Sequence, residues 1–180
     1  MKACNIKKFY APYYTVEQSW RHMEKTLEDW GKTEGLPKFL GMNLDPDFQR
    51  SHVWTEDKQI AYVEFCLRNG TGSRTILFNH PGWNDDYRGE MVLVDGKQRL
   101  EAVRKFIRNE LPIFGGNRLN DFDDPKALLR SSGANFSFSV NSLQTRREVL
   151  EWYLQINSGG VVHTKDELDK VEAMLEKEQP

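Results

Sequence analysis

The chain has 180 residues, enough for one domain with its own hydrophobic core. Its 25 Lys and Arg residues nearly balance 27 Asp and Glu residues, and the net charge of -2 argues against a basic surface over the whole protein, though not against a local basic patch. No apolar run approaches the roughly 20 residues that span a membrane, and the first residues have no apolar signal core. The two cysteines, Cys4 and Cys66, have neither metal-binding nor redox spacing. We therefore expect a cytoplasmic protein without a membrane partner.

The N-terminal third predicts an aromatic arm or strand over residues 1–14, followed by a helix. The sequence "TVEQ" is typical of a capping box in which Thr15 caps the helix and Gln18 reaches back. Apolar residues at helical spacing then extend to Trp30, and Gly31 is the expected stop.

Prolines keep the next segment, residues 36–54, extended or turn-like. Thr55 is the expected cap of a second helix over about residues 56–68, which "NGTG" ends. The runs "RTILF" and "EMVLV" predict two short strands joined by a loop rich in turn formers.

A helix from about Lys97 to Asn109 follows the second of these strands. Residues 112–133 have few periodic signals and are expected to form an exposed excursion. The alternating "NFSFSV" predicts a half-buried strand, "TRREVLEWYLQI" a helix that "NSGG" ends, and "HTKDEL" the capped start of a last helix. Strands and helices alternate, so we expect one mixed α+β domain over residues 1–180.

The segment "MVLVDGKQRLEAVRKFI" carries the first functional signal. A strand that ends in Asp-Gly and leads into a helix can bind phosphate, because the helix N-terminus presents backbone N–H groups and a partial positive charge. Gly96 permits a tight turn and close approach of a ligand. Arg99 falls within the apolar arc of the helix, whereas Lys97 and Gln98 fall on its polar arc. The charge of Arg99 needs a partner there, and its planar guanidinium suits phosphate. The structural alternative is that Asp95 caps the helix and Arg99 pairs with a carboxylate.

Two other segments strengthen this signal. In "DPDFQR", Gln49 and Arg50 lie on an extended segment shortly before Trp54 and the second helix. In "INSGG", Asn157 lies on the apolar arc of a helix at the point where the helix breaks. The Gly-Gly pair there can bring backbone near a ligand, although an ordinary helix C-cap is the more common role of such a pair.

The three segments together resemble the ParB/sulfiredoxin-like superfamily, and most closely the N-terminal domain of GmrSD-type restriction proteins and related DGQR-containing phosphorothioate-defence nucleases. That domain carries Pro-x-x-Gln-Arg…Trp, then Asp-Gly-x-Gln-Arg-Leu after a strand, then Ile-Asn-x-Gly-Gly before a capped helix. The matching stretches here are "PDFQRSHVW", "VDGKQRLEAV" and "INSGGVVHTKDEL", over roughly residues 37–175. A small standalone version of this kind would suit a phage or prophage.

The resemblance implies a small mixed fold whose Asp-Gly-x-Gln-Arg turn binds nucleotide phosphate. It assigns the core of the site to Asp95, Gly96, Lys97, Gln98 and Arg99, with Asp95 and Arg99 as the catalytic pair if hydrolysis occurs. It adds a second anion contact at Gln49 and Arg50 and a rim residue at Asn157. Larger relatives append an HNH nuclease domain, for which we find no readable counterpart among the four histidines of this sequence.

Three functions remain open at this point. The first is binding of a nucleoside triphosphate and its hydrolysis with Mg²⁺, in which Glu64 or Glu90 is a candidate to position water, although both are more typical of solvated surface. The second is a DNA-binding or DNA-nicking module that uses a basic patch of Arg99, Arg104, Lys105, Arg108, Arg146 and Arg147. The third is a non-enzymatic regulator of a host or viral partner protein, with contacts on residues 112–133. A cysteine nucleophile is disfavoured, because Lys97 and Gln98 stand where sulfiredoxins place one.

Overall fold

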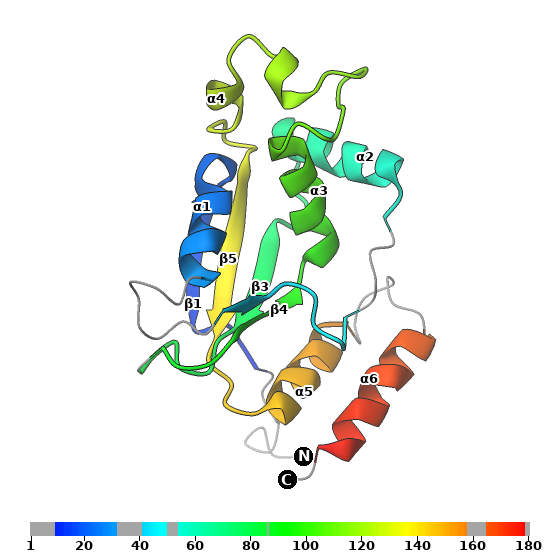
Figure 1. Cartoon of the computed structure of the whole chain (residues 1–180). Helices are drawn as coiled ribbons and strands as arrows, with labels where there is room; N and C mark the ends of the chain where they lie inside the picture. Colours follow the sequence, from blue (N-terminus) through cyan, green and yellow to red (C-terminus); the bar gives the residue numbers. More distant parts are fainter. Residues whose placement is uncertain (1–9, 32–40, 50–53, 86, 158–164, 179–180) are drawn as a thin grey trace, which may run out of the picture.

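Short apolar strands form the centre of the molecule, a mixed five-stranded sheet (Figure 1). The computed structural model describes residues 10–31, 41–49, 54–85, 87–157 and 165–178. The strands are β1 (Tyr14–Ser19), β2 (Met42–Asn43), β3 (Thr75–Asn79), β4 (Met91–Asp95) and β5 (Asn135–Asn141), in the order β1-β5-β3-β4-β2. The β1–β5 and β3–β4 pairs are antiparallel, whereas β3–β5 and β2–β4 are parallel.

The helices are α1 (Trp20–Gly31), α2 (Glu56–Leu67), α3 (Lys97–Ile107), the short α4 (Pro125–Leu128), α5 (Arg146–Asn157) and α6 (Lys165–Lys177). The predicted α+β class is therefore confirmed. Among the described residues, no helix combines the length and the apolar character that a membrane span requires.

Two cores lie on opposite faces of the sheet, and β4 contributes to both. Met91 and Leu93 pack with α1, α2 and α3, whereas Val94 packs with α5 and α6. Because successive side chains of a strand point to opposite faces, a strand covered on both sides is apolar without interruption, as "MVLV" is. This double burial fixes the position of the turn that follows β4.

The predicted helix start at Thr15 is wrong, because residues 14–19 form the edge strand β1. The backbone of this segment pairs with β5 over its whole length, and the Thr15 hydroxyl lies 2.9 Å from that of Ser139 across the two strands. The helical spacing holds only from Trp20 onward. Pairing with a strand more than a hundred residues away therefore overrides the local capping signal.

The segment of residues 112–133 is not simply an exposed excursion. It contains a 3-10 turn, Leu119–Asp121, and the short helix α4. Ile113, Leu119 and Leu129 are buried in the core shared with α3. Glu64 of α2 also holds this segment, since its carboxylate accepts a 2.6 Å hydrogen bond from the backbone N–H of Phe114.

The elements around the predicted site agree with the sequence. Thr55 caps α2, and its hydroxyl accepts from the backbone N–H of Lys58 at 3.4 Å. Helix α3 begins directly after β4 and buries Leu100 and Val103, as its apolar arc predicts. Ile107 is partly buried at the end of the same arc.

Candidate functional site

The turn between β4 and α3 is built around Gly96. This residue is the N-cap of α3 and has a left-handed backbone, with φ of 99°. A Cβ atom there would lie 2.6 Å from Cδ1 of Ile76 and 3.3 Å from Nη2 of Arg99. Both the backbone angle and the lack of space therefore require glycine. A glycine cap offers no side-chain oxygen to the first N–H groups of the helix, which have no acceptor within the helix.

Arg99 extends from the first turn of α3 back to the end of β4. Its Nη2 atom donates to Oδ2 of Asp95 at 2.6 Å and to the carbonyl of Thr75 at 3.0 Å. Its side chain is only 18% exposed, and Nε is buried without a hydrogen-bond partner among the described residues. Arg99 thus has the carboxylate partner of the structural alternative, but the N-cap is Gly96 and not Asp95.

Lys97 and Gln98 join this turn to the segments that precede α2. Lys97 forms an ion pair with Asp45, which follows β2. Gln98 is buried, and its Oε1 atom accepts from the backbone N–H of Trp54 at 3.1 Å. The helical wheel places Gln98 on the polar arc, so its burial is a correction to that prediction; its amide ties α3 to the start of α2.

Gln49 lies beside the same end of β4. Its Nε2 atom donates to the carbonyl of Leu93 at 2.6 Å. The structure therefore brings together parts of the first two predicted segments, since Asp45 binds Lys97, Gln49 binds the carbonyl of Leu93 and Trp54 binds Gln98. Arg50 lies outside the described residues.

The third predicted segment begins at Asn157, the last residue of α5. Asn157 is buried, and its Nδ2 atom donates to the carbonyl of Tyr153 in the same helix at 2.8 Å. This bond gives the Asn157 amide a partner within α5. Gly159 and Gly160 lie outside the described residues.

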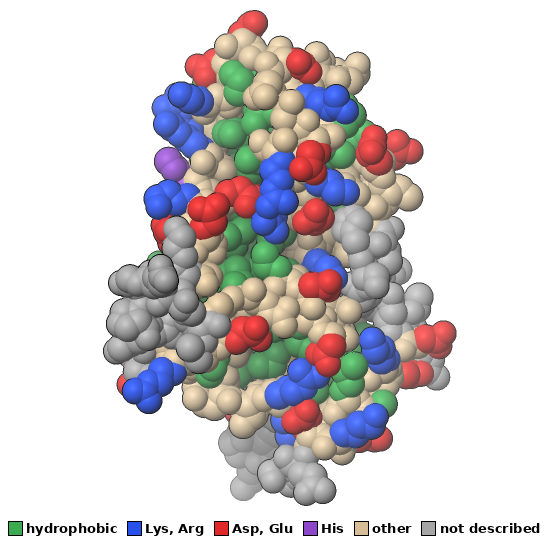
Figure 2. Space-filling model, in the orientation of Figure 1, with side chains coloured by type: hydrophobic (Ala, Val, Ile, Leu, Met, Phe, Trp, Pro, Cys, Tyr) green, Lys and Arg blue, Asp and Glu red, His purple; other side chains and the backbone are tan. Residues whose placement is uncertain are grey.

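The turn adjoins an open hollow of about 480 Å³, here named the α3 hollow. Strands β2 and β4 are parallel, so their carboxyl ends meet at one edge of the sheet, where α/β proteins commonly bind ligands. The hollow lies at this edge, and its lining residues are Leu44, Asp45, Leu93, Lys97, Leu100, Glu101, Arg104 and Lys105. Figure 2 shows basic and acidic side chains side by side over α3, with hydrophobic atoms exposed beneath them.

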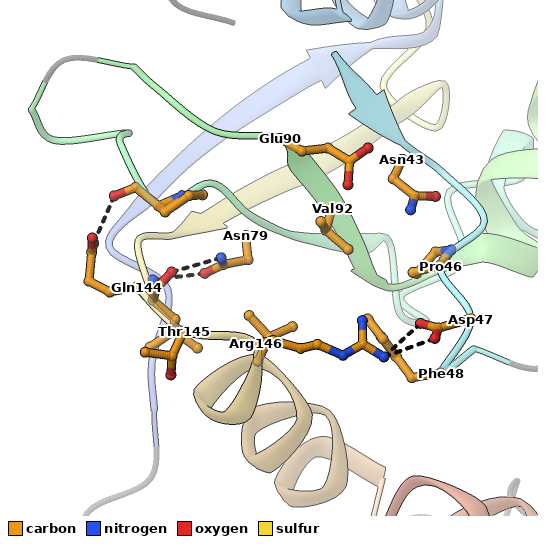
Figure 3. Close-up of a pocket in the computed structure, with 13 residues that line it drawn as sticks. Asn43, Pro46, Asp47, Phe48, Asn79, Glu90, Val92, Gln144, Thr145 and Arg146 are labelled. Atoms are coloured by element: carbon orange, nitrogen blue, oxygen red, sulfur yellow. Dashed lines mark hydrogen bonds and ion pairs between the residues drawn. The ribbon is translucent and has the colours of Figure 1, made fainter. Parts of the chain in front are cut away.

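Another pocket, of about 280 Å³, lies at the other end of β4, and no sequence motif predicts it (Figure 3). This α5 pocket lies at the N-terminus of α5, between Thr145, Arg146 and Asp47. The Glu148 carboxylate accepts from the backbone N–H groups of Gln144 and Thr145, at 3.0 Å each. This arrangement is a capping box, which the sequence "TRRE" indicates. It places the negative charge of Glu148 at the N-terminus of α5.

The basic residues proposed for DNA are largely engaged with carboxylates. Glu24 of α1 binds Arg104 and Arg108 at 2.8 and 3.3 Å. Arg146 pairs with Asp47 at 2.9 Å, and Arg147 pairs with Glu151 at 3.3 Å. These pairs lower the positive potential over α3 and α5, so the geometry gives no support to a DNA-binding patch.

Cys66 is suited to packing and not to nucleophilic attack. It is fully buried in α2, and this burial raises the pKa of its thiol, although a hydrogen bond with Tyr62 and the charge of Arg74 oppose the effect. A thiol must be deprotonated to react. The raised pKa therefore disfavours Cys66 as a nucleophile, as the sequence also does.

The described residues contain no group of three or more potential metal ligands. Mg²⁺ is commonly held by one or two carboxylates and the phosphates of a nucleotide, and Asp95 is the carboxylate of the turn.

Comparisons of the chain with protein-family models, curated proteins and solved structures found no match. The relation to the GmrSD-type domains therefore stays a prediction from the three motifs.

Proposed function

We propose that the protein binds the phosphate groups of a nucleoside triphosphate at the turn between β4 and α3. The observation that carries the proposal is the glycine-capped N-terminus of α3, with the partly exposed guanidinium of Arg99 in its first turn. Asp95 and the carbonyl of Thr75 hold the guanidinium in place, so little side-chain entropy is lost when an anion binds.

The surroundings of Arg99 suit an anion. The N-terminus of α3 is the positive end of an 11-residue helix, and its glycine cap gives the first N–H groups no side-chain acceptor. Lys97 adds a second cation to the first turn. Asp95 offsets part of this charge and is also the residue that would share Mg²⁺ with the phosphates, so hydrolysis stays part of the proposal.

Calorimetric titration with inorganic tripolyphosphate and with ATP, GTP, CTP and UTP, each with and without Mg²⁺, tests this proposal. Arg99→Ala should weaken binding by about 10- to 100-fold, the scale of a lost charged hydrogen bond. Arg146→Ala removes an arginine from the other helix end and should leave the affinity unchanged. Equal binding by the wild type and Arg99→Ala, or no binding by the wild type, would refute the phosphate site. Release of phosphate from ATP in the same samples measures hydrolysis.

A further inference from the structure

The α3 hollow begins where the proposed phosphate site ends. Lys97 is the first residue of α3 and also lines the hollow, which follows the helix as far as Lys105. At 1.5 Å per helical residue, this wall is about 12 Å long. A ligand whose phosphates lie at Gly96 would therefore have the rest of its structure beside the hollow.

The lining of the hollow combines an apolar floor with a charged rim. Leu93 and Leu100 lie beneath the floor, where the core covers them almost fully, and partly buried Leu44 supplies the accessible leucine side chain. A volume of about 480 Å³ lies within the range of small-molecule sites, which are mostly apolar with a few polar groups. Such a floor suits the flat face of an aromatic ring.

The charges at the rim favour a neutral, hydroxylated group over a further phosphate. The charge of Asp45 offsets that of Lys97, and the charge of Glu24 offsets that of Arg104. The other two charged residues of the lining, Lys105 and Glu101, carry opposite charges. The side chain of Asp45 is 79% exposed although it binds Lys97, so its carboxylate can still accept from a ligand. Carboxylates repel phosphate but accept hydrogen bonds from hydroxyl groups.

We infer that the α3 hollow binds the ribonucleoside part of the nucleotide, with the base against Leu44 and the ribose hydroxyls at Asp45 and Glu101. This inference rests on the proposed function, because the phosphates of the same ligand lie at Gly96 and Arg99. It assigns the ligand class as ribonucleoside triphosphate.

Two ligand comparisons on the unmodified protein test the inference. At least one of the four ribonucleotides should bind about tenfold or more tightly than tripolyphosphate, because only the nucleotide buries apolar surface in the hollow. Its 2′-deoxy counterpart should bind several-fold more weakly. If all four ribonucleotides bind no more tightly than tripolyphosphate, the hollow does not hold the nucleoside. If the deoxy form binds as tightly, the ribose assignment is wrong.

A pair of variants tests whether the nucleoside binds in the α3 hollow. Leu44→Trp fills the α3 hollow and should reduce nucleotide affinity to that of tripolyphosphate, while tripolyphosphate affinity stays unchanged. Leu143→Trp introduces the same side chain into the α5 pocket and should change neither. Equal weakening of both ligands by Leu44→Trp would overturn the inference, as would unchanged nucleotide binding. Tripolyphosphate binding that is absent, or insensitive to Arg99→Ala, would instead overturn the phosphate site itself.

Discussion

The N-termini of α3 and α5 lie at opposite ends of β4 and are capped in different ways. Helix α5 starts with Thr145 and Glu148, and one carboxylate oxygen of Glu148 accepts from two backbone N–H groups and from the Thr145 hydroxyl. Helix α3 starts with Gly96, which has no side chain, and places Lys97 and Arg99 in its first turn. Both helix ends adjoin a hollow in the surface.

The difference shows that a helix N-terminus beside a pocket is not by itself an anion site. At α5 an internal carboxylate already occupies the position that an external anion would take, and its charge would repel a second one. At α3 the internal carboxylate, Asp95, binds the side chain of Arg99. The predictions below test this contrast, beginning with the largest expected effect.

Gly96→Ala should destabilise the protein by about 3 kcal/mol, because it combines a strained backbone angle with a Cβ contact to Ile76 at 2.6 Å. Gly116→Ala is the matched control: its φ is also positive, at 108°, but a Cβ there meets nothing within 4 Å. It should cost only about 1 kcal/mol. Urea denaturation of both variants measures the difference. Equal losses would show that the turn is not crowded.

Arg99→Ala should cost about 2 kcal/mol of stability, because it leaves the Asp95 carboxylate and the Thr75 carbonyl without their donor. The loss should stay below that of a fully buried pair, since Asp95 is 29% exposed. A double-mutant cycle with Asp95→Ala measures the coupling, expected at about 1–2 kcal/mol. A coupling near zero would mean that the two side chains do not support each other in solution. Arg146→Ala, from the α5 end, should lose less than about 1 kcal/mol.

The sequence predicts these helix ends unequally, and the reasons are physical. The β4–α3 turn follows from an apolar strand, Asp-Gly and helical periodicity, all of them local signals. Asp95 and Arg99 are four residues apart, a spacing that also indicates their ion pair. A helical wheel of α3 alone does not show this pair. The Thr145–Glu148 capping box is equally readable, but nothing local shows that a pocket adjoins it.

Long-range contacts account for what the sequence could not predict. The Asp45–Lys97 ion pair and the bond from Trp54 to Gln98 join residues more than forty positions apart, so no periodic pattern encodes them. The same cause makes β1 a strand, because its partner β5 lies far along the chain. Buried Gln98 shows the limit of the helical wheel, which assigns amides to the solvent side although a buried amide can serve a backbone donor.

Glu148→Ala should remove about 1–2 kcal/mol of stability, because the backbone N–H groups of Gln144 and Thr145 just before α5 lose their acceptor. Glu148→Gln should lose less, because glutamine can still complete a capping box. Neither change should alter tripolyphosphate binding, since the α5 end lies away from Arg99. A large change in tripolyphosphate affinity, measured by calorimetry beside thermal denaturation, would place the anion at α5 and reverse the contrast between the two helix ends.

The smallest expected effect comes from Glu24, the carboxylate that offsets cations on α3. Burial raises the pKa of Glu24, but its bonds to Arg104 and Arg108 outweigh burial and hold the pKa below the ordinary value of 4.5. Because the folded-state pKa is the lower one, this contribution to stability is present above pH 4.5 and is lost as the pH falls through the folded pKa. Glu24→Gln should therefore cost about 1 kcal/mol at pH 7 and show a flatter decline in stability between about pH 5 and pH 3.

The same substitution leaves Arg104 uncompensated beside the α3 hollow. Tripolyphosphate affinity should then rise by about two- to threefold at low ionic strength, and the gain should vanish at about 0.5 M salt, where screening shortens the range of charge interactions. Glu178→Gln, which removes a carboxylate partner of Arg146 near α5, is the matched control and should leave the affinity unchanged. Because tripolyphosphate is a strong polyanion, a rise only in Glu24→Gln indicates that it binds on the α3 side. Equal rises in both variants would reflect net charge alone, and the difference between the helix ends would then carry no information about where the anion binds.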